Sequence, residues 1–327
     1  MKQLGKNGPL VSSVGFGCMG MSDFYGSKEN RNDKESIETI KFALDSGINF
    51  LNTGDFYGMG HNELLVAEAI KDRKEKPFIS VKFGALRDPN GAFLGFDARP
   101  NAVKNFAAYS LGRLNVEAID LYQPARVDPN VPIEETVGAV SELIKEGKVK
   151  YLGLSEVNSE QLRRAHKVHP VTAVEIEYAL ATRVIEKDLL KTARELGVSV
   201  VAYGVLSRGL LSDNLDFNFK QGDYRAYLPR FTGENFESNK KAIKLLEEIA
   251  KEKNCTIPQL AIAWVLHQGN DILPLIATTK KIRLEDNLKA LAIKLTEEEL
   301  KSISDAFPEG TFKGDRYDSH QMQMVLR

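Results

Sequence analysis

The segment FLNTGDFYGMGHNE, residues 50–63, carries the side chains with the clearest potential for chemistry. It begins like a buried strand and continues into a loop with several glycines, so a rigid element would hold the residues that follow. Those residues are Asn52, Asp55, Tyr57 and His61. Phenol, carboxylate and imidazole groups transfer protons in enzymes, so this loop is a candidate catalytic segment.

A second candidate is Lys82, which lies near the end of the apolar run FISVKF, residues 78–83. An ammonium group buried alone is costly, so Lys82 requires a polar partner, which the loop after residue 51 can supply. A phenol beside an ammonium group is expected to have its pKa lowered toward neutrality. Read in isolation, Tyr57 is also compatible with a packed aromatic residue and Lys82 with a structural ion pair. Together they predict a proton-transfer site.

The elements that must position these residues alternate along the whole chain. Short β-rich runs are followed by segments whose apolar residues recur every three or four positions. Eight strand–helix units favour a closed parallel barrel over an open, doubly wound sheet. Strands are predicted at 13–19, 49–53, 78–83, 118–123, 150–156, 173–178, 198–204 and 272–277. Helices are predicted at 33–46, 62–72, 100–114, 134–147, 159–168, 186–196, 257–268 and 283–290.

Helix ends and long loops refine this prediction. Gly47, Gly147 and Gly197 each follow a predicted helix and precede a strand, where a left-handed cap is common. Two long connections, 83–100 and 205–236, follow the third and seventh strands, and an extra helix is predicted at 237–253. Loops of this length in a compact domain usually have a function. No repeat or linker divides the chain, so we expect a single (β/α)8 barrel domain, an α/β TIM barrel, over residues 1–327.

Composition excludes several classes of protein. The 327 residues are 43% hydrophobic, and 44 basic against 45 acidic residues give a net charge of −1. This balance argues against nucleic-acid or membrane-surface binding driven by overall charge. No run of signal-peptide or membrane-spanning length is expected, and two cysteines are too few for a disulfide framework. The histidines lack zinc-ligand spacing, so no metal site is expected, and a cytoplasmic location is predicted.

The barrel prediction turns scattered residues into one candidate site. In such barrels the active site forms at the C-terminal ends of the strands. Asn52, Asp55 and Tyr57 follow the second strand and Lys82 ends the third, so they are neighbours. The other polar residues at strand ends include Gln123, Arg126, Ser155, Glu156, Glu175, Tyr203, Ser207, Thr278, Lys280 and Arg283.

Several of these segments resemble the aldo-keto reductase superfamily. The segment after residue 50 is similar to its FDTAxxYGxGxNE signature, and ISVK is similar to its lysine strand. AYGVLSRGLL resembles its seventh-strand segment YSPLGRGLL, and TTKKIRLEDN resembles its cofactor-phosphate segment. The resemblance covers nearly the whole chain in the same order. It implies a (β/α)8 barrel that binds NADP(H) in an extended pose and reduces carbonyl groups by hydride transfer.

The resemblance also assigns catalytic positions. Tyr57 corresponds to the catalytic acid of the family and Lys82 to the lysine that tunes it. Asn52 lies where the family has aspartate, and Ala125 lies where it usually has histidine. The Asn52 amide supplies no negative charge for Lys82, so Asn52 is predicted to be the weak point of the site, and Asn52→Asp to raise the rate. The alternative is that Asp55 supplies the missing charge.

The cofactor positions follow from the same resemblance. Ser155 and Glu175 fall on positions that contact the nicotinamide carboxamide, with Glu175 where glutamine is common and Glu156 where asparagine is common. Tyr203 falls on the aromatic residue that stacks on the nicotinamide ring. The remaining predicted cofactor-binding residues are Ser207, then Thr278, Lys280 and Arg283 for the 2′-phosphate, and Asp286 and Asn287 for the adenine. An arginine suits a phosphate because its guanidinium forms paired hydrogen bonds.

Two functions of different classes fit these residues. The first is an NADPH-dependent oxidoreductase that reduces small aldehydes or ketones, with Tyr57 as proton donor. The second is an NADP(H)-binding sensor or regulatory subunit with weak turnover, which the replacements at Asn52 and Ala125 would allow.

Overall fold

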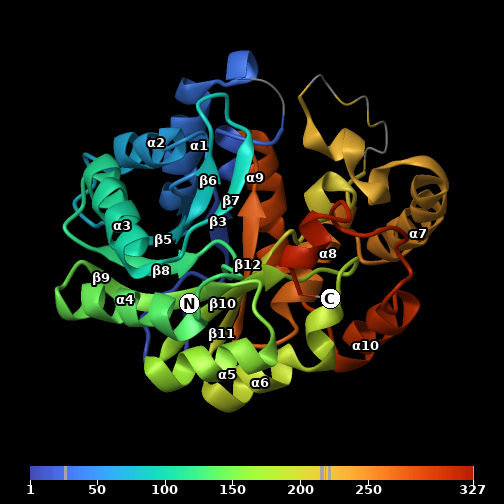
Figure 1. Cartoon of the computed structure of the whole chain (residues 1–327). Helices are drawn as coiled ribbons and strands as arrows, with labels where there is room; N and C mark the ends of the chain where they lie inside the picture. Colours follow the sequence, from blue (N-terminus) through green and yellow to red (C-terminus); the bar gives the residue numbers. More distant parts are fainter. Residues whose placement is uncertain (26–27, 214–216, 218, 220–221, 327) are drawn as a thin grey trace.

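Eight parallel strands close into a barrel in this computed structural model, which describes residues 1–25, 28–213, 217, 219 and 222–326. The strand order around the barrel is β10, β11, β12, β3, β4, β5, β8 and β9. Figure 1 shows helices surrounding this barrel. The predicted (β/α)8 fold is confirmed.

The barrel strands lie close to their predicted positions. They are β3 (Gly15–Gly17), β4 (Phe50–Gly54), β5 (Phe78–Phe83), β8 (Ile119–Pro124), β9 (Val149–Ser155), β10 (Val171–Glu177), β11 (Ser199–Tyr203) and β12 (Ile272–Ala277). The first strand is shorter than the predicted 13–19. Neighbouring strands pair in parallel register throughout, for example Gly54 with Lys82 and Glu175 with Ser155. The C-terminal ends of the strands therefore meet at one end of the barrel.

The helices of the outer layer also follow the sequence pattern. They are α1 (Asp33–Asp45), α2 (His61–Ile70), α3 (Pro100–Leu114), α4 (Ile133–Lys145), α5 (Ser159–Val168), α6 (Leu189–Leu196), α7 (Gly233–Glu252), α8 (Ile257–Leu266) and α9 (Lys281–Leu288). Gly47, Gly147 and Gly197 have positive φ angles of 86°, 70° and 68°, as expected for left-handed caps. The predicted helix 186–196 is divided into a 3₁₀ turn, η3 (Val184–Lys187), and α6.

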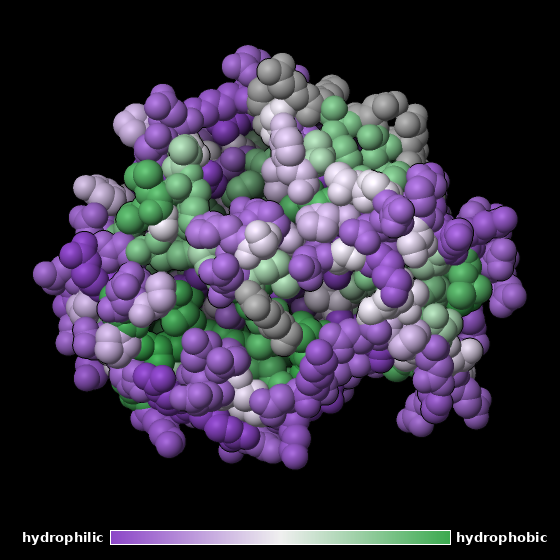
Figure 2. Space-filling view, turned by 45° about the vertical axis from the view of Figure 1, so that its right-hand side comes forward, coloured by the Kyte–Doolittle hydropathy of each residue, from purple (hydrophilic) through white to green (hydrophobic). Residues whose placement is uncertain are grey.

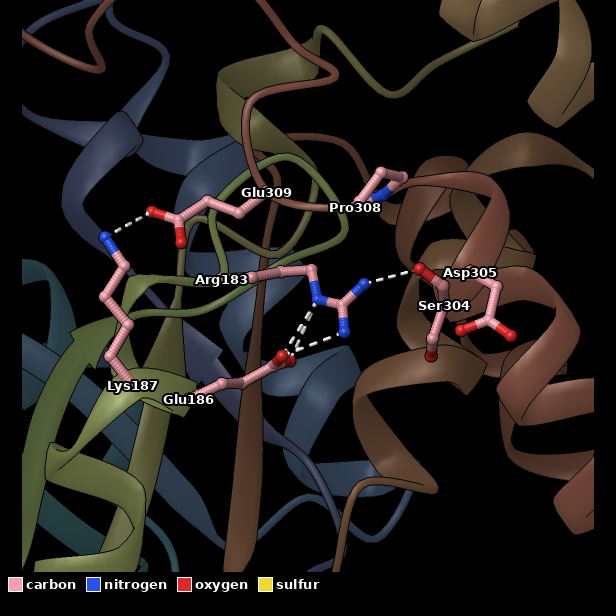
Figure 3. Close-up of a pocket in the computed structure, with 7 residues that line it drawn as sticks. All are labelled: Arg183, Glu186, Lys187, Ser304, Asp305, Pro308 and Glu309. Carbon is pink, nitrogen blue, oxygen red and sulfur yellow. Dashed lines mark hydrogen bonds and ion pairs between the residues drawn. The ribbon is translucent and has the colours of Figure 1, made fainter.

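The structure contains a helix that the sequence pattern does not predict, α10 (Glu297–Ala306). It begins with a capping box between Thr296 and Glu299, a signal that the sequence carries. Arg183, just before η3, ties α10 to the barrel by donating to the carbonyl oxygens of Ser304 (2.6 Å) and Phe307 (3.0 Å). A surface pocket of about 410 Å³ lies beside this contact and is lined by charged residues (Figure 3). It shares no residue with the candidate site.

A short N-terminal hairpin, β1 (Lys2–Gln3) and β2 (Leu10–Val11), closes the end of the barrel at which the strands begin. Lys2 Nζ donates to the carbonyl oxygen of Ile272, the first residue of β12 (2.6 Å), and the Gly5 N–H donates to Ser199 Oγ at the start of β11 (2.7 Å). Leu4 packs with Val11 and with apolar residues of the barrel interior. The hairpin therefore seals the end that carries no candidate chemistry.

The two long loops lie at the C-terminal end of the strands. Residues 83–100 form a hairpin, β6 (Ala85–Arg87) with β7 (Phe93–Phe96). The connection after β11 contains 3₁₀ turns at Ser207–Gly209, Tyr224–Tyr227 and Pro229–Phe231, and α7 begins at Gly233 rather than at the predicted 237. The Arg225 guanidinium lies over the Tyr25 ring at 4.9 Å, so this connection contacts the loop after β3.

In the view of Figure 2, hydrophilic side chains predominate and hydrophobic ones gather in a few patches. Within the described residues, no helix has both the length and the apolar character to cross a membrane. The same residues contain no cluster of three or more histidine, cysteine, aspartate or glutamate side chains arranged to hold a metal ion.

Leu4→Ala is expected to destabilise the protein, because the Leu4 side chain is 1% exposed and closes the barrel core. The expected loss is about 2–5 kcal/mol in the free energy of unfolding. Leu10→Ala, in the same hairpin and 60% exposed, is the matched control with an expected change within about 0.5 kcal/mol. Urea unfolding measures both, and equal effects would show that the hairpin does not seal the core.

Candidate active site

The centre of the site is a buried cluster of Asn52, Lys82 and Glu175 from three barrel strands. Lys82 Nζ donates to Asn52 Oδ1 at 2.6 Å and forms an ion pair with Glu175 Oε1 at 2.8 Å. Asn52 Nδ2 donates to Glu175 Oε2 at 2.6 Å. All three side chains are buried, and Lys82 is only 4% exposed. Lys82 therefore has the polar partner that the sequence predicts, Asn52, and a second, unpredicted partner, the Glu175 carboxylate from β10.

Gln123 and Ser80 complete the cluster. Gln123 Nε2 donates to Glu175 Oε2 (2.5 Å) and to Ser80 Oγ (3.2 Å). Asn52 Nδ2 also lies 3.4 Å from Ser80 Oγ. Gln123 was recognised in the sequence only as a residue at a strand end, and Ser80 was not singled out. Their inward orientation is a consequence of barrel register, which the sequence alone does not fix.

The ion pair corrects the expectation that Lys82 faces a neutral partner. Burial lowers the pKa of Lys82, and the Glu175 carboxylate opposes this by favouring the charged ammonium form. The family resemblance assigns Glu175 to the cofactor, whereas the polar partners that the sequence predicts for Lys82 are Asn52, Asp55 and Tyr57. The reason for the error is spatial, because β10 lies across the barrel from β4 and is distant from it in sequence.

Asp55 does not supply the missing charge. Its backbone N–H donates to the Lys82 carbonyl oxygen (2.9 Å), but no ion pair joins the two side chains among the described residues. Burial, followed by the nearby Glu63 carboxylate, raises the pKa of Asp55 to about 8. Asp55 is therefore mainly protonated near neutral pH, and the alternative in which it replaces the family aspartate is not supported.

Tyr57 lies beside the cluster in the glycine-rich turn after β4. Gly58 and Gly60 have positive φ angles of 58° and 92°, which glycine adopts readily, and they carry the chain from the strand into α2. Lys82 Nζ lies 5.4 Å from the centroid of the Tyr57 ring. Tyr57 is 5% exposed.

The pKa of Tyr57 differs from the expectation. Burial raises it well above its ordinary value, and the Glu175 carboxylate raises it further. The predicted lowering by Lys82 is wrong for this structure, because burial and then the Glu175 carboxylate raise the pKa of Tyr57 by more than the nearby Arg126 cation lowers it. The phenol is therefore protonated, which is the form that can donate a proton.

His61 lies outside this cluster. Its Nδ1 is 2.9 Å from Ser22 Oγ, and its Nε2 faces Asp33 at 3.2 Å. Both contacts join the start of α2 to the segment after β3 and to α1. The imidazole thus contributes to loop structure in this arrangement.

Arg126, one of the polar residues at the strand ends, has no role that the sequence predicts. Ala125 is buried and carries no polar side chain, while the half-buried Arg126 donates from Nη1 to the Ala125 carbonyl oxygen (2.6 Å). Its guanidinium lowers the pKa of Tyr57, partly opposing the effects of burial and Glu175. A cation in this place favours negative charge at the phenol oxygen.

The predicted nicotinamide residues gather at the same end of the barrel. Ser155 pairs in register with Glu175 on the adjacent strand. The hydroxyl oxygens of Ser155 and Ser207 are buried and have no hydrogen-bond partner among the described residues. Buried hydroxyl groups are normally satisfied, so these two fit the polar groups of a bound molecule. The donor set is compatible with a nicotinamide cofactor.

The C-terminal segment reaches this region through Glu156. Arg316 donates to both Glu156 oxygens (2.9 and 2.7 Å), and the Leu326 N–H donates to Oε2 (3.0 Å). Tyr203 donates from its hydroxyl to Glu156 Oε1 (2.7 Å) and lies 3.1 Å from the Tyr317 hydroxyl. Burial opposes ionisation, but Arg316 holds the pKa of Glu156 at about 2. The C-terminal loop 310–327 is expected to shape the pocket, but its contact with Glu156 is not predicted from the sequence; Figure 1 shows the described residues of this segment in red.

The predicted phosphate residues lie between β12 and the first turns of α9. Arg283 is exposed in the first turn of α9 and has no carboxylate partner within the described part of the chain. Lys280 is exposed too, but its Nζ lies 2.6 Å from Glu35 Oε2. Thr278 Oγ1 accepts from the Lys280 N–H (3.1 Å).

The two predicted adenine residues lie further along α9. Asn287 is buried. Asp286 Oδ1 accepts from Gln259 Nε2 of α8 (3.0 Å). Among the described residues of this segment, Arg283 has no carboxylate partner, and neither has Lys281, whose ammonium group lies over the Phe42 ring.

Comparison with known proteins identifies the class. The sequence model of the Aldo/keto reductase family matches residues 14–307, and the chain belongs to this family. It is 43% identical over 321 residues to "Probable aldo-keto reductase 1" from Glycine max, covering 96% of this chain and 91% of that protein. Family membership makes the chain an oxidoreductase of carbonyl compounds that uses a nicotinamide cofactor.

Solved structures of other proteins have a similar fold. The glycerol dehydrogenase AKR11B4 from Gluconobacter oxydans is similar with a TM-score of 0.85 and 30% identity, covering 98% of this chain and 97% of that one. The aldo-keto reductase AKR11C1 from Bacillus halodurans, in its holo form, gives a TM-score of 0.76 and 26% identity, with 98% of both chains covered. The barrel is thus shared over nearly the full length.

Asp55→Asn is expected to stabilise the protein at alkaline pH. The ordinary carboxyl pKa is near 3.8 and the folded value is about 8, so folding takes up a proton between these values. Stability from this group falls as pH rises through that window and is lost above about pH 8. Urea midpoints at pH 5 and pH 9 should differ less in Asp55→Asn than in the parent. If the two proteins lose stability in parallel, Asp55 is not the buried acid described here.

Proposed function

We propose that this protein is an NADPH-dependent reductase of small aldehydes or ketones, with Tyr57 as the proton donor. The observation that carries the proposal is the buried Tyr57 phenol beside the ion-paired Lys82 at the C-terminal end of the barrel strands. Barrel enzymes place their chemistry at this end.

The cofactor would be held by residues at or after the ends of four consecutive barrel strands, β9, β10, β11 and β12. Ser155, Glu175, Tyr203 and Ser207 are proposed to contact its nicotinamide half, a role supported by the unpaired hydroxyl groups of Ser155 and Ser207. Thr278, Lys280, Arg283, Asp286 and Asn287 are proposed to bind its adenosine 2′-phosphate end. When bound, NADPH supplies the hydride. The absence of a carboxylate partner for Arg283 among the described residues leaves its guanidinium available for a phosphate.

Tyr57 supplies the proton for the reduction. Its hydroxyl group would donate to the substrate oxygen as negative charge develops there, leaving a phenolate. The Arg126 guanidinium lowers the pKa of Tyr57 and so favours that phenolate, and the Lys82 ammonium lies 5.4 Å from the centroid of the Tyr57 ring. Because the site is buried, these charges act with little screening by water, and such fixed charges are usually the largest catalytic contribution.

The sensor alternative loses part of its basis. It depended on a site weakened at Asn52 and Ala125. The Lys82–Glu175 ion pair supplies a carboxylate, and Arg126 places a cation beside Ala125. Enzymatic turnover is therefore the function that this geometry supports best.

Tyr57→Phe is expected to lower the turnover of an aldehyde by about a hundredfold to ten-thousandfold, since it removes the donated proton. NADPH affinity, measured by fluorescence titration, should change little because the phenol acts on the substrate. Tyr109→Phe, on the exposed face of α3, is the matched control. A Tyr57→Phe protein within a few-fold of the parent rate would mean that another group donates the proton.

Arg283→Ala is expected to weaken NADPH binding by about tenfold to a hundredfold, because it removes a charge-assisted contact with the 2′-phosphate. NADH affinity should remain nearly constant, so the preference for NADPH should fall. Lys294→Ala removes an exposed cation beyond α9 and serves as the control. Equal dissociation constants for the two cofactors in the parent, or an unchanged preference in Arg283→Ala, would contradict this site.

A further inference from the structure

We propose that the carboxylate and the amide beside Lys82 have exchanged strands relative to the family pattern, which has aspartate at position 52 and glutamine at position 175. In this protein Glu175 positions Lys82 and favours its charged form, while Asn52 serves as the neutral bridge. The catalytic part of this inference rests on the proposed reductase function. Its structural part concerns only the buried cluster and is tested without turnover.

Hydrogen-bond polarity supports the exchange. Asn52 accepts from Lys82 through Oδ1 and donates to Glu175 Oε2 through Nδ2. A carboxylate at position 52 could accept from the lysine but could not donate to Glu175. Each end of the Asn52 amide thus faces a charge of the sign that its dipole favours. The neutral side chain is complementary to a charged residue at position 175.

The position of Glu175 in the barrel gives it the contacts of a lysine partner. It comes from β10, which is not a neighbour of β4 or β5 in the barrel order, so its side chain reaches Lys82 across the interior. One oxygen contacts Lys82, and the other accepts from Asn52 and Gln123. These three donors fix the carboxylate, which in turn fixes the ammonium group.

Charge balance makes the exchange testable. The parent cluster contains one ammonium and one carboxylate and is neutral. Glu175→Gln leaves a buried positive charge, and Asn52→Asp adds a second carboxylate 2.6 Å from the first. The double variant Asn52→Asp/Glu175→Gln restores one carboxylate and one amide, in the arrangement that the family resemblance gives for these two positions. An unpaired buried charge is strongly destabilising, so the two single changes should compensate each other.

The first experiment measures thermal unfolding of the parent, both single variants and the double variant without cofactor at pH 7. Each single variant is expected to unfold about 4–8 °C below the parent, and the double variant to recover most of that loss. Additive losses would show that positions 52 and 175 do not share a charge and would overturn the proposal. Ser155→Ala, beside Glu175 but outside the hydrogen-bonded cluster, is the control for a generally fragile core.

The second experiment measures kcat, NADPH affinity and the pH profile of aldehyde reduction. Glu175→Gln should lower kcat by about tenfold to a hundredfold while changing the NADPH dissociation constant much less. Loss of the carboxylate disfavours the ammonium group, so the alkaline limb of the profile should move to lower pH. Asn52→Asp alone should also lower kcat, which is the reverse of the expectation from sequence. The double variant should restore both kcat and the pH at which activity falls on the alkaline side.

The outcomes separate the two proposals. If the parent shows no turnover, the proposed function fails, and recovery of stability in the double variant still decides the exchange. If the parent is active but Glu175→Gln lowers only cofactor affinity, Glu175 acts through the cofactor alone and the positioning role is wrong. An Asn52→Asp protein that is faster than the parent would also overturn the exchange.

Discussion

The buried ion pair between Lys82 and Glu175 is the interaction on which the arrangement of the site depends. Burying an ammonium group is expensive unless a carboxylate and further hydrogen bonds satisfy it. Here Glu175, Asn52 and the groups around them meet that demand. The pair holds a positive charge near the Tyr57 ring, and its carboxylate raises the pKa of Tyr57. Because the three side chains come from β4, β5 and β10, the closed barrel is a condition for their contact.

The rest of the molecule protects this polar interior. The N-terminal hairpin seals one end with apolar contacts, so the polar cluster belongs to the other end alone. At that end, the loops after β3 and β11 meet through Tyr25 and Arg225, and the C-terminal segment is fixed by the Arg316–Glu156 pair. Exclusion of water strengthens the electrostatic interactions inside.

The sequence predicted the barrel because its evidence is local. Apolar periodicity, glycine caps and strand spacing are read within short windows, and α5 (Ser159–Val168) and α3 (Pro100–Leu114) begin and end where predicted. Tyr57 and Lys82 were found because each lies in a distinctive segment. The partner of Lys82 was missed because Glu175 is distant in sequence and meets the lysine only across the closed barrel. The return of Arg316 to Glu156 was missed for the same reason.

The protonation state of Lys82 tests this account most directly. NMR of protein labelled at the lysine side chains, without cofactor, can follow the Lys82 signal through a pH titration, with assignment by its loss in Lys82→Met. Lys82 is expected to be an ammonium group at pH 7 in the parent and to lose its proton at lower pH in Glu175→Gln. A neutral Lys82 amine at pH 7 in the parent, or a titration that Glu175→Gln leaves unchanged, would contradict the central role of the ion pair.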